Sequence, residues 1–199
     1  MKRLCVIAFV LSATQASAQA ECRTIASDAE RLSCYDIANG VKTTETAPAE
    51  AFGKWQISSD FSAMTDDRSV FMMLESENAV SGRYGTPGPA VLILRCRENA
   101  TSAFFTFNGL FMSDIQGHGR IEYRLDQDKM AAIDTTASNN NQALGLWNGS
   151  KSIPWIKKLL GKEKLVVRAV PHSESAVVAT FDIRGIDGGL TELRDTCNW

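Results

Sequence analysis

The sequence predicts a mainly β domain of the antiparallel sandwich type over residues 52–199, with two short helices. Three observations lead to this fold class. Short apolar stretches recur about every ten residues, which is the spacing of an all-β domain. Several of these stretches alternate apolar and polar side chains, as half-buried strands do. The regular succession of strand and helix that marks a parallel sheet is absent.

Seven stretches have the length and composition of strands. They are residues 54–58, 69–76, 90–96, 101–109, 119–126, 164–171 and 175–185. The fifth alternates most cleanly, because Ile121, Tyr123 and Leu125 share one predicted face. Arg124 and Asp126 fall on the other face, which we expect to meet solvent.

Two helices interrupt or follow the strands. Residues 150–162, SKSIPWIKKLLGK, combine a serine cap, Pro154 in the first turn and apolar residues at helical spacing. Residues 188–199, GGLTELRDTCNW, predict a closing helix that turns two leucines and Cys197 toward the core. The polar stretch at 135–145, TTASNNNQALG, is predicted to be a loop.

The first 18 residues have the layout of a secretory signal peptide, with a basic start, an apolar run and small residues at Ala18 or Ala20 for cleavage. The apolar run is shorter than the ~20 residues of a membrane span. Cleavage after Ala18 leaves 19 basic and 23 acidic residues, a formal charge of −4. That balance argues against a nucleic-acid partner. We therefore expect a periplasmic or secreted protein with no membrane anchor after cleavage.

Four cysteines follow the predicted cleavage site: Cys22, Cys34, Cys96 and Cys197. An even number in an exported chain predicts two disulfides, for which three connectivities are possible. None of the four has a CxxC partner, so the spacing favours neither a zinc site nor a redox pair. We expect no metal and no cofactor.

Helix geometry favours a bond between Cys22 and Cys34. Ser27 and Glu30 have the spacing of a capping box, which predicts a helix that starts near Asp28. A helix continuous from Cys22 would separate the two sulfurs by ~18 Å, and no bond could form. With the cap at Ser27, the preceding residues are extended and can fold back onto the helix.

The remaining two cysteines then pair by elimination. The sequence predicts a disulfide-clipped helical hairpin at residues 19–42 and a polar, Pro- and Ala-containing linker at 43–51. The linker separates the first pair from the second. A bond between Cys96 and Cys197 would tie the closing helix to a core strand.

Charged residues in two predicted turns are candidates for contacts with a partner. Asp66 and Asp67 lie in TDDRS, where the simpler explanation is a turn in which Asp66 caps backbone amides. Arg124 and Asp126 lie two residues apart in IEYRLD, where the simpler explanation is a surface ion pair worth ~0–1 kcal/mol.

No catalytic or metal-binding motif emerges from the sequence. His118 lies between glycines and His172 follows a proline, so both are expected to be exposed turn residues. DQDKM begins like an EF-hand loop, but Ala131 stands where that loop needs glycine and Ala137 where it needs glutamate. We expect a hairpin turn there, and no enzyme activity.

An ordered set of motifs covers nearly all of the chain after the predicted signal. It consists of CRTIASDAERLSCYD, WQISSDFSAMTDDRSVFMML, VLILRCRENATSAFF, IEYRLD, KLVVRAVPHSESAVVATFDIRG and LRDTCNW. Together these motifs resemble the type VI secretion-associated VasI or TagO family. The stretch DKMAAIDTTASNNNQALGLW departs from that pattern, because it is longer and more polar.

The resemblance implies a periplasmic accessory protein that works with a contractile secretion machine and binds another envelope protein, with no catalytic role. Two alternatives stay open. One is a periplasmic inhibitor or immunity protein that plugs a cell-wall hydrolase with the loop at 134–145 or with RYGTPGPA. The other is a cell-wall enzyme that uses Asp66, Asp67 and Asp126, although paired carboxylates must face each other across a substrate.

Overall fold

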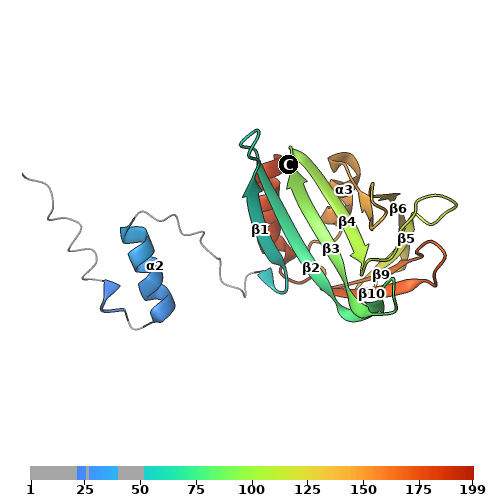
Figure 1. The fold of residues 1–199 in the computed structure, drawn as a ribbon, viewed down its shortest axis with the longest axis horizontal. Helices are drawn as coiled ribbons and strands as arrows, with labels where there is room; N and C mark the ends of the chain where they lie inside the picture. The colour runs from blue at the N-terminus through green and yellow to red at the C-terminus, as the bar shows by residue number, and fades with distance from the viewer. Residues whose placement is uncertain (1–21, 26, 40–51) are drawn as a thin grey trace, which may run out of the picture. The chain divides into compact units, whose positions relative to one another are not determined.

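The computed structural model describes residues 22–25, 27–39 and 52–199. The chain divides into two compact units, residues 1–47 and 48–199, and each is described by itself. The predicted signal peptide and the predicted linker lie outside the described residues. Helices and strands carry the labels of Figure 1.

The N-terminal unit contains helix α2, Asp28–Ala38, which begins where the sequence predicts. The predicted disulfide joins Cys22 to Cys34, with a Cα–Cα distance of 5.5 Å. Arg31 Nη1 donates to the carbonyl oxygen of Ile25 at 3.0 Å and holds the preceding turn against the helix. The described residues thus show one helix and a turn, and not the predicted helical hairpin.

Two antiparallel sheets form the main unit, in agreement with the predicted mainly β class (Figure 1). The larger sheet has the order β1 (Gln56–Phe61), β2 (Arg68–Ser81), β3 (Pro87–Arg97), β4 (Ala100–Phe107), β8 (Ala143–Leu146) and β7 (Thr136–Ala137). The smaller sheet has the order β10 (Val177–Asp182), β9 (Lys164–Ala169), β5 (Arg120–Leu125) and β6 (Ala131–Asp134).

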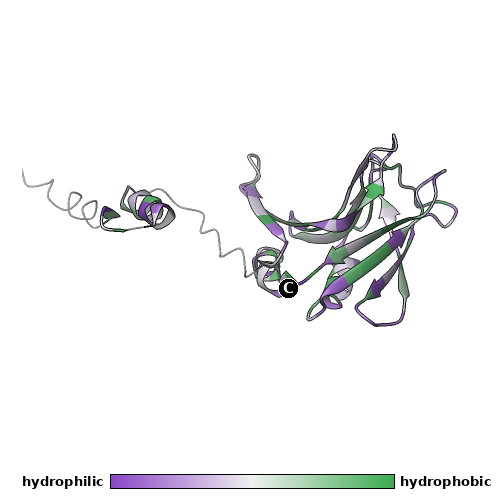
Figure 2. Ribbon diagram, turned by 90° about the horizontal axis from the view of Figure 1, so that it is seen from below, coloured by the Kyte–Doolittle hydropathy of each residue, from purple (hydrophilic) through white to green (hydrophobic). Residues whose placement is uncertain are grey.

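Alternation of side chains sets the inward face of each sheet. In β5 the residues Ile121, Tyr123 and Leu125 are buried, as predicted from their spacing. In the larger sheet, Met72 pairs with Leu94 across β2 and β3, and both side chains are fully buried. Figure 2 shows the resulting mixture of hydrophobic and hydrophilic residues along the strands.

Aromatic rings join the two sheets at the centre of the core. The ring of Phe105 on β4 lies 6.0 Å from that of Phe181 on β10 and 5.7 Å from that of Trp155. Trp155 in turn meets Tyr123 of β5 at 6.0 Å. Such pairs add about 0.5–1.5 kcal/mol each beyond the burial of their surface.

Helix α3, Gly149–Lys157, packs against β4 and β8. Its N-cap is Asn148, whose side chain accepts from the backbone N–H of Lys151 at 3.2 Å. The predicted serine cap is therefore wrong, because the helix begins at Gly149 and Asn148, a capping residue as favourable as serine, takes the N-cap position. Pro154 is the sixth of the nine residues of α3, and not in the first turn as expected, because the helix begins at Gly149.

Helix α4, Ile186–Cys197, packs against β2 and β3 of the larger sheet. Its inward residues include Leu190, Leu193 and Cys197, as predicted. The second predicted disulfide joins Cys197 to Cys96 of β3, with a Cα–Cα distance of 5.7 Å. A loop of this length contributes roughly 4–5 kcal/mol by the chain-entropy model.

The stretch at 135–145 is not the loop that the sequence predicts. It contains β7 and the start of β8, and all four residues of β8 are buried. Gly145 lies so close to β4 that a Cβ there would be 2.5 Å from the Cβ of Phe104. The sequence does not predict these strands, because the stretch consists mainly of small and polar residues and lacks an alternating apolar pattern. Pairing with residues distant in the sequence makes them strands.

On one side, the two sheets are joined by the chain itself. Strand β6 ends at Asp134 and β7 begins at Thr136, so the chain passes from the smaller sheet into the larger through one residue. That residue, Thr135, donates to the carbonyl oxygen of Gly119 from its backbone N–H at 2.8 Å and from its hydroxyl at 2.6 Å. We call this junction the closed seam.

Candidate functional site

The other junction between the sheets lies where β2 approaches β10, and we call it the open seam. Strand β1 pairs with β2 only as far as Met73, so the rest of that edge of β2 has no neighbour from β1. The pairing of β2 with β3 also shifts register between Glu75 and Ala79. A bulge of this kind bends a strand, and here β2 continues toward β10.

Asn78 in this bulge links the two strands through its side chain. Its Nδ2 donates to the carbonyl oxygen of Val178 at 2.9 Å, and its Oδ1 accepts from the N–H of Thr180 at 2.8 Å. The carboxamide thus binds β10 as a peptide group of a neighbouring strand would. A side chain takes the place of a backbone ladder at this point.

A charged cluster closes one end of the open seam. Lys54 Nζ lies 2.9 Å from Glu77 Oε1 on β2 and 3.4 Å from Asp182 Oδ2 on β10. Arg184 makes a bidentate hydrogen bond to Asp182. Its Nε donates to Oδ1 at 2.7 Å and its Nη2 donates to Oδ2 at 2.6 Å. Lys54 is held here because the preceding Gly53, with φ of 58°, packs against the backbone of Arg184.

These contacts shift the ionisation of the cluster. The guanidinium of Arg184, by its hydrogen bonds, lowers the pKa of Asp182 from 3.8 to about 2. Hydrogen bonds to Glu77 and then to Asp182 raise the pKa of Lys54. These shifts favour the charged forms of Asp182 and Lys54, and the cluster links Glu77 of β2 to Asp182 of β10.

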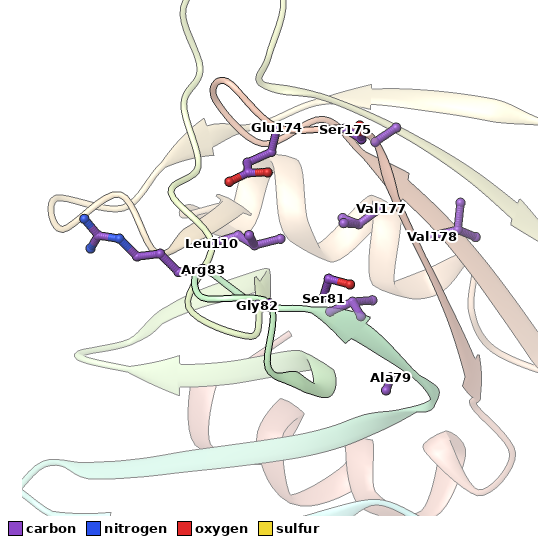
Figure 3. Close-up of a pocket in the computed structure, with 12 residues that line it drawn as sticks. Ala79, Ser81, Gly82, Arg83, Leu110, Glu174, Ser175, Val177 and Val178 are labelled. Atoms are coloured by element: carbon purple, nitrogen blue, oxygen red, sulfur yellow. The ribbon is translucent and has the colours of Figure 1, made fainter.

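Beyond Asn78 the two strands separate and leave a groove of about 380 Å³. Figure 3 shows Ala79 and Ser81 of β2 on one side, and Val177 and Val178 of β10 on the other. Leu110 adds to the apolar lining. One basic residue, Arg83, and one acidic residue, Glu174, also line the groove. The other lining residues are small: Gly82, Gly85, Ser175 and Ala176.

The edge of β10 offers backbone groups to this groove. The carbonyl oxygen of Val178 and the N–H of Thr180 point toward Asn78, away from β9. Because the N–H and C=O of one residue in an antiparallel strand point to the same side, the N–H of Val178 also faces the seam. Within the described residues that N–H has no hydrogen-bond partner, and Val178 is 47% exposed.

The residues singled out in the sequence lie elsewhere. Asp66 and Asp67 are in the β1–β2 connection, where Asp66 has a φ of 56°. The side chain that accepts from the amides of that turn belongs to Ser62, and not to Asp66 as predicted. Asp67 lines a different surface depression with Arg97. Neither carboxylate reaches the open seam.

Arg124 and Asp126 do not share a strand face, because β5 ends at Leu125 and Asp126 belongs to the hairpin turn that was expected there. Arg124 donates to the carbonyl oxygen of Asp128 at 3.0 Å. Asp126 Oδ1 accepts from the backbone N–H of Lys164 at 2.8 Å. Arg124 thus stabilises the turn, Asp126 ties the turn to the start of β9, and no ion pair joins the two residues in the described part of the chain.

Sequence reasoning missed Asn78, Lys54 and Asp182, which build the open seam. One signal was present: the polar run ESEN interrupts the apolar pattern of β2 in mid-strand. A polar interruption in a long strand is typical of a bulge. The position of β10 opposite that bulge, 100 residues away in the chain, could not be read from it.

Two further observations bear on where the protein works. Disulfides such as the two present here are typical of proteins that fold outside the cytoplasm. No helix in the described residues has the length and apolarity needed to cross a membrane.

Comparisons with known proteins place the chain in a family. Among solved structures, it is similar to invasion associated protein B from Bartonella henselae, with a TM-score of 0.48 and 13% identity, over 74% of this chain and 96% of that chain. No curated protein sequence matches it. Residues 21–199 match the family described as Type VI secretion system VasI, EvfG, VC_A0118, as the ordered motifs suggest. The chain therefore belongs to the VasI family of type VI secretion system proteins.

Proposed function

We propose that this protein is a non-catalytic accessory protein of the cell envelope, periplasmic or secreted, that binds another envelope protein of a type VI secretion system. Membership of the VasI family supports the secretion context. The two disulfides support folding in an oxidising compartment. The observation that carries the binding function is the open seam between β2 and β10.

The open seam suits an extended segment of a partner protein. Such a segment would lie along the edge of β10, accept from the N–H of Val178 and so add a strand to the smaller sheet. Its alternate side chains would contact Val177 and Leu110 in the groove. Exposed strand edges are ready templates for pairing with another chain, and this one is covered by a single asparagine.

Crosslinking in living cells tests both the partner and the surface. A photoreactive amino acid replaces Val178 in the groove or, as the control, Met64, which is 92% exposed in the β1–β2 connection. We expect a component of the secretion machine to be captured from position 178 only. Equal capture from both positions, or capture of no secretion component, would contradict the proposal.

A pair of substitutions tests the mode of binding once that component is known. Val178→Pro removes the free N–H, whereas Val178→Ala keeps it and shortens the side chain. Loss of one backbone hydrogen bond, at 0.5–1.5 kcal/mol, should weaken capture by about 2- to 10-fold in Val178→Pro relative to Val178→Ala. Equal affinities for the two variants would exclude strand addition at this edge.

A second candidate function is inhibition of a cell-wall hydrolase. The observation in its favour is the β2–β3 connection, where Tyr84 is 87% exposed and Arg83 lies 5.7 Å from the centre of its ring. A rigid projecting turn can enter an active site with little loss of conformational entropy. Inhibition of purified peptidoglycan hydrolases, and its loss in Tyr84→Ala, would favour this function over the first.

A further inference from the structure

The only two histidines of the chain lie side by side, although 53 residues separate them in the sequence. The rings of His118 and His172 have centroids 5.7 Å apart and planes inclined by 47°. His172 is exposed and His118 is half-buried. The sequence predicts two unrelated turn residues, and the fold brings them to one place.

The backbone fixes the position of His118. Its N–H donates to the carbonyl oxygen of Ile115 at 3.1 Å and closes a tight turn. The two residues between them, Gln116 and Gly117, have φ values of 55° and 85°. Positive φ at both central positions is the pattern of a type I′ turn, which has little freedom to move its last residue.

His172 is fixed from a different part of the chain. Its backbone N–H donates to the carbonyl oxygen of Phe111 at 3.0 Å, and the ring of Phe111 meets its imidazole edge-on at 5.9 Å. These contacts hold the β9–β10 connection against the residues that follow β4. Two anchored segments therefore hold the two imidazoles next to each other.

In each ring, one nitrogen is already engaged. Nδ1 of His118 lies 3.4 Å from the carbonyl oxygen of Val170, which can only accept, so this contact favours the tautomer with its proton on Nδ1. Nδ1 of His172 lies 3.0 Å from the hydroxyl of Ser173. The Val170 contact leaves the lone pair of His118 on Nε2, and the same holds for His172 in the tautomer whose Nδ1 donates to the Ser173 hydroxyl. Histidines that bind metals use their other ring nitrogen in this way.

We propose that His118 and His172 together bind one divalent transition-metal ion through their two Nε2 atoms. Imidazole favours Cu²⁺, Ni²⁺ and Zn²⁺ over Mg²⁺ and Ca²⁺. Bonds of about 2.0–2.1 Å to each nitrogen place two ring centroids on the order of 5–6 Å apart, which matches the observed spacing.

The site has two protein ligands, because no group of three His, Cys, Asp or Glu side chains gathers in the described residues. Water completes the coordination, and the ion exchanges with solution. The ion would also secure the β9–β10 connection, which carries Glu174 into the lining of the groove.

Calorimetric titration of the chain, purified from the periplasm without a histidine tag, tests the site with Cu²⁺, Ni²⁺ and Zn²⁺ in turn. We expect one ion per chain and no heat of binding with Mg²⁺. His118→Gln and His172→Gln should each weaken binding by about tenfold or more, and the double variant, which keeps neither ligand, should bind no ion. Ser173→Ala is the matched control, which keeps both ligands and should lose less.

A second measurement uses the unaltered chain and does not depend on the folding of any variant. During titration with Zn²⁺, the side-chain ¹⁵N resonances of both histidines should shift together and saturate at one equivalent. Shifts at only one ring, saturation at two equivalents, or affinity unchanged in either single variant would overturn the proposal.

Discussion

The two seams between the sheets are built from different parts of the chain. At the closed seam, the backbone runs directly from β6 into β7, and Thr135 bonds to the backbone of Gly119. At the open seam, β2 and β10 are 100 residues apart, and the links between them are the side chains of Asn78 and Lys54. One seam is part of the polypeptide, and the other is a set of side-chain contacts.

The two seams therefore differ in whether their backbone groups are accessible to another protein chain. At the closed seam, the backbone N–H and the hydroxyl of Thr135 both donate to the carbonyl oxygen of Gly119, so these groups are already paired. The open seam keeps a backbone edge in reach of solvent, because one carboxamide covers only two of its groups. A segment that takes part in binding is expected to come from the less stable end of a structure. The following substitutions test that contrast, in order of expected effect.

The largest effect should come from crowding the closed seam. In Gly119→Ala, the new Cβ would lie 2.6 Å from the carbonyl oxygen of Thr135 and 2.9 Å from the Cα of Asp114. Both neighbours are backbone and cannot swing aside, so we expect a loss of about 2–3 kcal/mol in the free energy of unfolding. Urea denaturation measures it. Gly149→Ala, which meets only the flexible end of Ile153, is the control and should change little.

Removal of the carboxamide at the open seam should have a smaller effect. Asn78→Ala leaves the N–H of Thr180 and the carbonyl of Val178 without their partner, at an expected loss of about 1–2 kcal/mol. Amide exchange at Thr180 should accelerate while exchange at Thr135 stays unchanged. Asn78→Asp keeps the acceptor and should protect Thr180 better than alanine does. Equal acceleration at both amides would mean that the seams open together.

Acid should weaken the charged end of the open seam. The pKa of Asp182 is about 2 in the folded protein against 3.8 for the free group, so its contribution is complete above pH 4 and is lost as the pH falls toward 2. Because its partners Lys54 and Arg184 are largely exposed, we expect about 1–2 kcal/mol. Unfolding measured between pH 2 and 6 should show this slope, and Asp182→Asn should flatten it.

The smallest effect is expected from Val178→Pro. The N–H that it removes faces the groove and has no partner among the described residues, so the free energy of unfolding should change by less than about 0.5 kcal/mol. Thr180→Pro, two residues along the same edge, removes the N–H that bonds Asn78 and should destabilise more. Thermal melts compare the two. If Val178→Pro lowers the free energy of unfolding more than Thr180→Pro does, the N–H of Val178 has a hydrogen-bond partner in the folded protein.

Much of the fold could be predicted because its strands bury alternate apolar side chains. The alternating apolar residues Ile121, Tyr123 and Leu125 predict β5 in this way. The seven predicted stretches overlap β1, β2, β3, β4, β5, β9 and β10. The short strands β6, β7 and β8 could not be found, because they become strands only when β5, β8 and β4, respectively, pair with them. Local pattern cannot show pairing that depends on distant neighbours.

The candidate site could not be predicted for a related reason. Asn78 is one of several polar residues in ESEN, and nothing in its surroundings in the sequence distinguishes it from Ser76. Its role depends on which strand comes to lie opposite. The same holds for His118 and His172, which look like separate turn residues until the fold brings their rings together. Both disulfides were predictable, because helix geometry and a count of four leave one pairing.

The order of the disulfides along the chain has a consequence for biogenesis. From residue 22 onward the cysteines bond in consecutive pairs, Cys22 with Cys34 and Cys96 with Cys197. An oxidant that joins thiols in the order in which they emerge from a translocation channel would make both native bonds directly. No exchange of partners, the slow step of disulfide rearrangement, is then needed. The second bond must wait longer than the first, because Cys197 follows Cys96 by 101 positions whereas Cys34 follows Cys22 by 12.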